Sequence, residues 1–168
     1  MKDYKILFTG SVCSGKTTAI RSVSDIETLD TDAQASDVTV RRKKNTTIAM
    51  DYGVLDLNDD TRVHLYGTPG QERFRFMWDM LTSEFAHDAI GMVLLVDNTR
   101  KDPFRDIRFY AKEFGDYLRQ RRLIIAVTHS DVEPSPDYNR YLSELKGLGV
   151  MTTVMFVDAR DPRAILGV

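Results

Sequence analysis

One eight-residue segment near the N-terminus constrains the fold more than any other part of this sequence. Gly10-Ser11-Val12-Cys13-Ser14-Gly15-Lys16-Thr17 matches the pattern G-x-x-x-x-G-K-[ST], and it stands between a β-rich run, Lys5–Thr9, and a segment of helical character. Its glycines let the backbone wrap around an anion, and the following helix N-terminus adds partial positive charge. The segment therefore predicts a cradle for the phosphates of a nucleoside triphosphate, with Lys16 beside the β- and γ-phosphates and the Thr17 hydroxyl on Mg²⁺.

The composition fits one soluble globular domain covering residues 1–168. The chain has 168 residues, 42% of them hydrophobic and 29% charged, with a net charge of −2. Basic residues gather only in short runs that are typical of solvated loops, so neither a nucleic acid nor a membrane surface is predicted as a partner. The single cysteine, Cys13, excludes an intrachain disulfide and suits a reducing compartment. Without a long apolar run or a lipidation signal, we expect a cytoplasmic protein with no stable membrane anchor.

Short apolar runs alternate with amphipathic segments along the chain, which is typical of an α/β fold with helices on both faces of a sheet. Six strands and four helices are expected. The strands are Tyr4–Thr9, Ile48–Leu57, Arg62–Tyr66, Ile90–Asp97, Leu123–Thr128 and Thr153–Val157, and the helices are Lys16–Val23, Phe74–Phe85, Phe104–Gln120 and Pro136–Leu148. The turn at 58–60 predicts a hairpin, and hence one antiparallel edge strand in a mostly parallel sheet. Only 158–168 follow the last strand, so a C-terminal covering helix is expected to be short or missing.

A second motif follows the third predicted strand. Gly67-Thr68-Pro69-Gly70-Gln71-Glu72-Arg73-Phe74, taken with the cradle, resembles the switch II element of Ras-like small GTPases, whose usual form is Asp-x-x-Gly-Gln-Glu. The resemblance implies a three-layer nucleotide-binding G domain with switch II at 67–78. It also implies that the Gly70 N–H senses the γ-phosphate and that the Gln71 amide orients the attacking water, with Lys16 as the third catalytic residue.

The polar segment Ser24–Asn45 has little periodicity, and a loop of this length in a compact domain is usually functional. By the same resemblance, 24–47 is switch I. Thr47 aligns with the threonine that binds Mg²⁺ and the γ-phosphate, with Thr46 as the alternative. The implied metal ligands are Thr17 and Thr47.

Two later segments resemble the family's base-recognition motifs. Thr128-His129-Ser130-Asp131 stands where the family has Asn-Lys-x-Asp, and Asp158-Ala159-Arg160 stands where it has Ser-Ala-Lys. Asp131 would accept hydrogen bonds from guanine N1 and N2, and the Ala159 N–H would meet guanine O6. The complete set of nucleotide-binding residues implied by the resemblance is Gly10, Ser14, Gly15, Lys16, Thr17, Thr18, Thr47, Gly70, His129, Asp131, Ala159 and Arg160.

Four departures from the family pattern limit what can be transferred. Gly67 replaces the switch II aspartate that normally holds Mg²⁺ through water, so either a nearby acid such as Asp37, Asp51 or Asp97 substitutes for it or the metal is held more weakly. Val12 stands where Ras itself has glycine, which predicts slow intrinsic hydrolysis.

The other two departures concern the base and the transition state. Thr128-His129 replaces Asn-Lys, so the tie between base loop and cradle is expected to be weak, while the histidine ring can stack on the base. No arginine finger is identifiable from the sequence. The arginines near the switches are Arg41, Arg42, Arg73 and Arg75.

The function implied by the resemblance is a switch that uses GTP, GDP and Mg²⁺ and controls the binding of a partner protein. Two alternatives stay open: a nucleotide-dependent scaffold with little hydrolysis, and a phosphate-loop kinase that transfers the γ-phosphate to a small acceptor. More narrowly, Thr47–Gly53 with Tyr66–Phe74 resembles predicted bacterial and archaeal GTPases related to the gliding-motility polarity switches. That resemblance implies a prokaryotic protein with an effector or a roadblock-type regulator as partner.

Overall fold

The computed structural model describes residues 1–30, 50–71, 74–118, 122–132 and 137–168. Its centre is a seven-stranded sheet in the order β2-β3-β4-β1-β5-β6-β7. The strands are β1 (Lys2–Gly10), β2 (Leu29–Asp30), β3 (Asp51–Asn58), β4 (Thr61–Gly67), β5 (Gly91–Asp97), β6 (Arg122–Thr128) and β7 (Thr153–Phe156).

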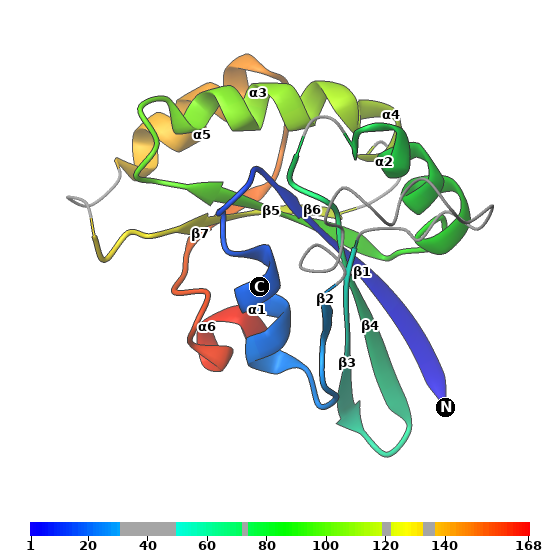
Figure 1. Cartoon of the computed structure of the whole chain (residues 1–168). Coiled ribbons are helices and arrows are strands. Elements are labelled where there is room, and N and C mark those ends of the chain that lie inside the picture. The colour runs from blue at the N-terminus through cyan, green and yellow to red at the C-terminus, as the bar shows by residue number, and fades with distance from the viewer. Residues whose placement is uncertain (31–49, 72–73, 119–121, 133–136) are drawn as a thin grey trace, which may run out of the picture.

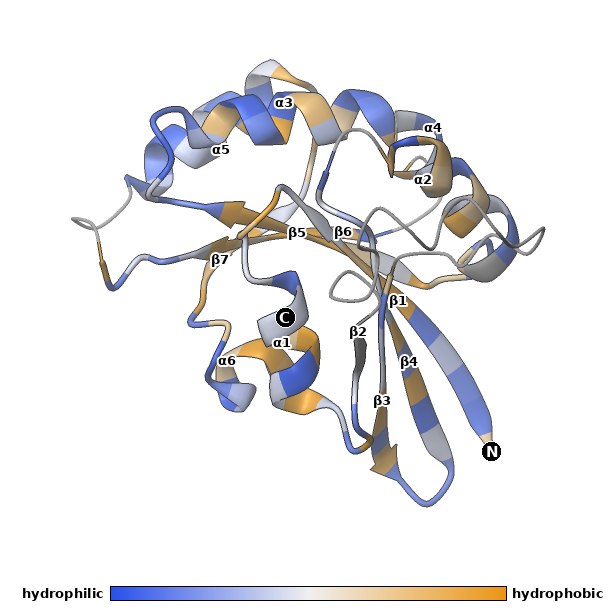
Figure 2. Ribbon diagram, viewed as in Figure 1, coloured by the Kyte–Doolittle hydropathy of each residue, from blue (hydrophilic) through white to orange (hydrophobic). Residues whose placement is uncertain are grey.

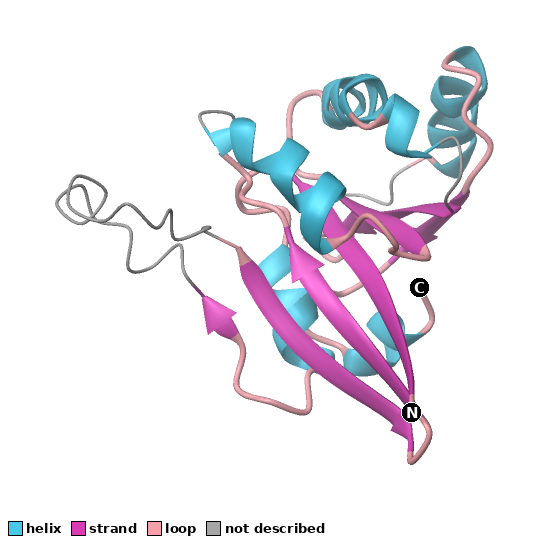
Figure 3. Ribbon diagram, turned by 90° about the vertical axis from the view of Figure 1, so that its right-hand side faces the viewer, coloured by secondary structure: helices cyan, strands magenta, loops and turns pink. Residues whose placement is uncertain are grey.

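The six strands expected from the sequence form this sheet. Strand β3 is antiparallel to β4, as the hairpin predicts, and β1 is parallel to both β4 and β5. The two-residue β2 was not expected; it pairs with β3 at Leu29↔Tyr52 and extends that edge. Figure 3 shows the N-terminus beside the hairpin turn, where the Lys2 N–H donates to the Asp60 carbonyl at 2.7 Å.

Helices cover both faces of the sheet, which gives three layers (Figure 1). On one face lie α1 (Lys16–Val23) and α6 (Pro162–Leu166); on the other lie α2 (Phe76–Met80), α3 (Pro103–Glu113), α4 (Gly115–Leu118) and α5 (Tyr138–Gly147). Helix α1 has the predicted bounds. The predicted helix at 74–85 divides into α2 and a π-helical turn, η2 (Leu81–Phe85), and the predicted helix at 104–120 divides into α3 and α4 near Phe114.

Each face has its own apolar core. The α1 face is built on buried residues such as Ile20, Leu65 and Leu95, and the α3 face on Trp78, Ile107 and Ile125. Figure 2 shows β4 with alternating hydrophobic and hydrophilic residues, as expected for a strand that buries one face. The strands β5 and β6 are apolar over most of their length because helices cover both of their faces.

The C-terminal helix is short, as the sequence predicts. Helix α6 has five residues, and its Ile165 is 6% exposed against the sheet. Beside it lies an apolar groove of about 300 Å³ lined by β1, β4 and β5. Among the described residues, no helix is long and apolar enough to cross a membrane.

Candidate functional site: a phosphate cradle at the carboxyl ends of the strands

The cradle Gly10–Thr17 connects the end of β1 to the first turn of α1. Gly10 and Gly15 have φ angles of 145° and 96°, values that favour glycine because a Cβ would be strained there. Lys16 is only 7% exposed, and its Nζ donates to the carbonyl oxygens of Gly10 and Ser11 at 2.9 and 2.7 Å. The local fold therefore holds an ammonium group inside the loop, where it can neutralise a phosphate.

The cradle contains a polar atom without a partner. The Ser14 Oγ is buried and makes no hydrogen bond within the described part of the chain. An unpaired buried hydroxyl is costly, but Ser14 is 0% exposed and is not among the residues that line the nucleotide cavity. A cavity of about 230 Å³ opens above the loop, and its lining residues include Gly15, Lys16, Thr17, Thr18, Asp51, Gly70, Gln71 and His129.

Gly70 in the switch II motif lies directly on the cradle. A Cβ at Gly70 would stand 2.7 Å from the Lys16 Nζ and 2.8 Å from the Val12 backbone nitrogen, so no larger residue fits without movement. The preceding turn is held from the other side, because the buried indole Nε1 of Trp78 donates to the Pro69 carbonyl at 3.1 Å. Pro69 and Gly70 are therefore held between the cradle and Trp78.

Asp51 occupies the space that an aspartate at Gly67 would need. The two residues are paired across β3 and β4, and a Cβ at Gly67 would stand 2.9 Å from the Asp51 Cβ. Asp51 is 7% exposed and its Oδ2 accepts from the Thr17 hydroxyl at 2.7 Å. A carboxylate and a hydroxyl held together beside the cradle are the hard oxygen ligands that Mg²⁺ prefers, so this pair fits the metal.

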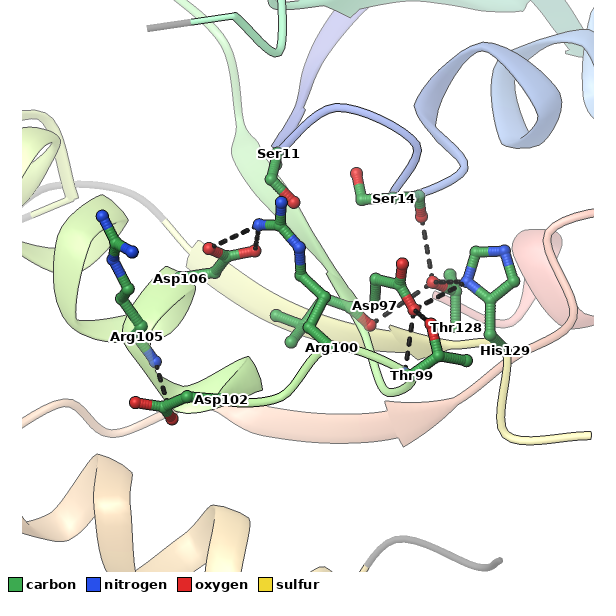
Figure 4. Close-up of polar contacts among 12 residues, drawn as sticks. Ser11, Ser14, Asp97, Thr99, Arg100, Asp102, Arg105, Asp106, Thr128 and His129 are labelled. Atoms are coloured by element: carbon green, nitrogen blue, oxygen red, sulfur yellow. Dashed lines mark hydrogen bonds and ion pairs between the residues drawn. The ribbon is translucent and has the colours of Figure 1, made fainter. Parts of the chain in front are cut away.

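The first base-recognition segment is tied firmly to the cradle (Figure 4). The Thr128 Oγ1 is buried and donates to the Ser14 carbonyl at 2.9 Å. The weak tie expected when threonine replaces asparagine is thus a buried hydrogen bond. Because it joins the end of β6 to the loop after β1, it fixes the base segment relative to the phosphates.

His129 and Asp97 form a polar group next to that tie. His129 has a φ of 56°, and its Nδ1 lies 3.1 Å from the Thr128 Oγ1 and 3.2 Å from the Asp97 Oδ1. Asp97 also accepts from the backbone N–H and hydroxyl of Thr99 at 2.9 and 2.7 Å (Figure 4). Asp97 does not line the cradle cavity, so of the acids considered for the metal, Asp51 is the one beside the phosphates.

Arg160 joins the two base-recognition segments. Its guanidinium lies 2.8 Å from Asp131 and 2.7 Å from Asp158. Hydrogen bonds from the Arg160 side chain and backbone N–H hold the pKa of Asp158 at about 2. Asp158 therefore stays charged at neutral pH, and Asp131 already has a cationic partner where the sequence predicts guanine.

Comparison with known proteins places the chain in a family. Residues 27–155 match the family described as conserved hypothetical ATP binding protein. The chain belongs to this ATP-binding family. The match begins after the cradle, so it does not depend on the Gly10–Thr17 motif.

Two plant relatives of this family member are Ras-related proteins. It is 27% identical to the Ras-related protein YPT3 of Nicotiana plumbaginifolia over 119 residues, which are 66% of this chain and 53% of that protein. It is 30% identical to the Ras-related protein RABA6a of Arabidopsis thaliana over 110 residues, 62% of this chain and 46% of the relative. The chain thus spans about half the length of these two relatives.

The fold of this family member is that of a Ras-like small GTPase. The structure of the Arl6 BBS3 small GTPase from Trypanosoma brucei with bound nucleotide analogue GppNp superimposes with a TM-score of 0.68 at 10% identity. The superposition covers 99% of this chain and 92% of that one. The expected three-layer α/β architecture is confirmed.

The structure brings most of the predicted site residues of this ATP-binding family member together, but not all. Seven of them line the cradle cavity: Gly15, Lys16, Thr17, Thr18, Gly70, Gln71 and His129. Gly10 and Ser14 lie beneath it and take part through their carbonyl groups. Asp131, Ala159 and Arg160 lie beside the cavity rather than in its lining, although an added Cβ at Gly15 would stand 3.1 Å from the Ala159 Cβ. Thr47, Arg41, Arg42, Arg73 and Asp37 lie outside the described residues.

Sequence reasoning named Asp51 only as one of several acids, although the hairpin register identifies it. With the turn at 58–60, Asp56 pairs with Arg62 and Leu55 with Val63, and counting back along both strands brings Asp51 opposite Gly67. This residue count from the hairpin turn is the signal in the sequence that identifies Asp51. The Arg160 ion pair had no signal in the sequence, because it depends on two loops that meet only in the folded chain.

Proposed function

We propose that this chain is a guanine-nucleotide-dependent switch that binds GTP and GDP with Mg²⁺, hydrolyses GTP slowly, and controls the binding of a partner protein. The observation that carries the proposal is the single cavity in which Lys16, the Thr17–Asp51 pair and Gly70–Gln71 meet. A phosphate-binding cation, a metal-binding oxygen pair and a switch residue in direct contact with the cradle are the parts that phosphoryl transfer to water requires.

Each residue has a defined task in this proposal. Lys16 exchanges its two cradle carbonyl oxygens for phosphate oxygens, and the Thr17 hydroxyl with the Asp51 carboxylate holds Mg²⁺. Bound there, Mg²⁺ supplies positive charge that offsets the phosphate oxygens. Gln71 orients the attacking water. Gly70 lies so close to the Lys16 Nζ that a γ-phosphate must displace it, which moves the switch.

Slow turnover is supported by Val12. Its side chain is 46% exposed and lines the same cavity as Gln71, so it takes up room that the amide and the water need. We expect single-turnover hydrolysis by the isolated chain to be slow, and Val12→Gly to accelerate it. Fast hydrolysis by the unmodified chain would contradict this part of the proposal.

A second candidate is an adenine-nucleotide site, and two observations favour it. The family description names ATP, and the Asp131 carboxylate that would select guanine is paired with Arg160 at 2.8 Å. A scaffold that binds nucleotide with little hydrolysis is the remaining alternative. The narrower relation to gliding-motility switches, with a roadblock-type partner, stays a prediction from the switch sequences.

One experiment separates these candidates. The purified chain is denatured, its bound nucleotide is identified by chromatography, and fluorescent GDP, GTP and ATP are then titrated with and without Mg²⁺. Tight, Mg²⁺-dependent binding that prefers guanine supports the proposed switch. Equal or tighter binding of ATP supports the adenine site, and binding without hydrolysis supports the scaffold. No binding of any nucleotide would refute all three.

A further inference from the structure

A second, larger cavity adjoins the nucleotide cavity and lies between the switch residues and α3. It has a volume of about 560 Å³, and its walls are the cradle residues Ser11 and Val12, the switch residues Gly70 and Gln71, and the start of α3 with the loop before it. Val12, Gly70 and Gln71 also line the nucleotide cavity, so these three residues form a shared wall.

The charges around this cavity favour an anion. Three cations line it, Arg100, Lys101 and Arg105. The two acids in its lining are already engaged: Asp106 holds the Arg100 Nη1 at 2.8 and 3.0 Å, and Asp102 holds Arg108 at 2.7 Å. Within the described ranges, the side chains of Lys101 and Arg105 have no ion pair.

Arg100 is the fixed member of this set. Its carboxylate partner Asp106 is buried at 8% exposure on the inner side of α3, whereas Arg100 is half exposed at the cavity. Only the Nη1 atom of the guanidinium is used by Asp106. Within the described part of the chain the remaining guanidinium donors of Arg100 have no partner, and the ion pair with Asp106 holds them in place, as a fork for oxygen atoms requires.

A buried hydroxyl faces the same space. Ser11 is 7% exposed, and its Oγ has no hydrogen-bond partner among the residues that the structure describes. Figure 4 shows the Ser11 side chain directed toward the Arg100 guanidinium. An unpaired buried hydroxyl is rare because it costs free energy, and here it would be satisfied by an oxygen bound to Arg100.

The remaining wall is aromatic. Phe109 and Tyr110 line the cavity, and both contact Trp78. Their ring centroids lie 5.9 and 5.4 Å, respectively, from the ring centroid of Trp78. A single small ion would leave most of a cavity of about 560 Å³ unfilled, so an apolar body attached to the anionic group fits better.

We propose that this cavity is a second ligand site, which binds an oxyanion, phosphate or carboxylate, carried on a small apolar body. Arg100, Lys101 and Arg105 supply the charge, the Ser11 hydroxyl supplies a short polar contact, and Phe109 packs against the apolar part. Because Gly70 and Gln71 form the shared wall, the ligand biases the position of the switch. That last consequence rests on the proposed function, whereas the binding itself does not.

The test is a direct titration with three probes: phenyl phosphate, benzoate and inorganic phosphate. Trp78 is the sole tryptophan of the chain, so its fluorescence reports on the aromatic wall, and amide chemical shifts along α3 locate the bound probe. We expect phenyl phosphate or benzoate to bind more tightly than inorganic phosphate. The tighter of the first two identifies the ligand as a phosphomonoester or a carboxylic acid.

Variants separate this site from the cradle. Lys101→Ala with Arg105→Ala should weaken probe binding about tenfold or more, because each charge-assisted contact is strong. Ser11→Ala should weaken it by a smaller factor, while Arg163→Ala, an exposed arginine on α6, is the matched control and should change nothing. Lys16→Met removes anion binding at the cradle and should leave phenyl phosphate binding at α3 unchanged.

Three results would overturn the proposal. They are probe binding that the Lys101/Arg105 double variant leaves unchanged, probe binding that Lys16→Met abolishes, and the absence of chemical-shift changes along α3 at saturating probe. Loss of nucleotide binding with retained probe binding would instead count against the proposed switch and leave this site intact.

Discussion

At the scale of single residues, the binding of guanine by Asp131 depends on Arg160. The carboxylate that the sequence assigns to guanine lies 2.8 Å from the guanidinium, and the pair is more than half exposed. Exposed ion pairs are weak because water screens them, so a base with two N–H donors can compete for Asp131. The sequence also predicts that Arg160 contacts the nucleotide. If Arg160 only pairs with Asp131, its removal strengthens guanine binding, whereas if Arg160 contacts the nucleotide, its removal weakens that binding.

We expect Arg160→Ala to tighten GDP binding by about twofold to fivefold and to leave ATP binding unchanged, since it frees Asp131 at the cost of one weak ion pair. Fluorescent-nucleotide titration measures both affinities, and Arg163→Ala is the control. Weaker GDP binding in Arg160→Ala would mean that Arg160 contacts the nucleotide directly. Asp131→Asn should weaken GDP binding and shift the preference toward xanthine nucleotides.

At the scale of secondary-structure elements, the β3–β4 hairpin carries an acid at Asp51 of β3 in place of the family's aspartate at position 67 of β4. Asp51 stands opposite Gly67, and only the absence of a side chain at Gly67 makes room for it. A carboxylate is thereby kept beside Thr17 although the switch II motif has lost its aspartate. Cross-strand neighbours are the unit of sheet stability, so the two positions should be strongly coupled.

Gly67→Asp should destabilise the fold by about 2 kcal/mol or more, because it overpacks a tight site and places two carboxylates together. The swapped variant, Gly67→Asp with Asp51→Gly, should recover most of the stability and the Mg²⁺ dependence of nucleotide binding. Thermal unfolding and Mg²⁺ titration provide the measurements. Additive losses in the double variant would show that the two positions are independent.

Helix α2, in which switch II ends, is anchored by Trp78. Trp78→Phe keeps the aromatic core but removes the 3.1 Å bond to the Pro69 carbonyl, and it should cost about 1–2 kcal/mol. In Trp78→Phe, amide hydrogen exchange should accelerate more at Gly70 and Gln71 than elsewhere in the chain, which would locate the loss of stability at the switch. Phe114→Leu is the control: its ring lies 5.5 Å from Trp78, and it should lower overall stability without a selective effect at the switch.

At the scale of the whole molecule, the cradle, the switch and both base segments join the ends of β1, β4, β6 and β7. A ligand that bridges them binds only the folded chain and must raise its stability. At one hundred times its Kd, GDP with Mg²⁺ should contribute about 2.7 kcal/mol, which for a chain of this size raises Tm by about 5–10 °C. Differential scanning fluorimetry measures the shift, which Lys16→Met should remove. An equal shift with ATP would favour the adenine site.

The sequence by itself determined the elements and their order. The strands, the hairpin, helix α1 and the cradle follow from local patterns: hydrophobic period, turn residues and a glycine-rich motif act over a few neighbouring residues. Local patterns did not reveal where α2 gives way to the π-helical turn η2.

Only the tertiary structure decided which residues, distant in the sequence, bond to one another. It joined Thr128 to Ser14, paired Arg160 with Asp131, brought the Asp51 carboxylate to the Thr17 hydroxyl, and built a cationic cavity from the cradle, the switch and α3. These contacts link segments separated by tens of residues, and their geometry depends on sheet order and strand register. A linear motif carries the chemistry of each group, whereas the distance between groups is a property of the folded chain.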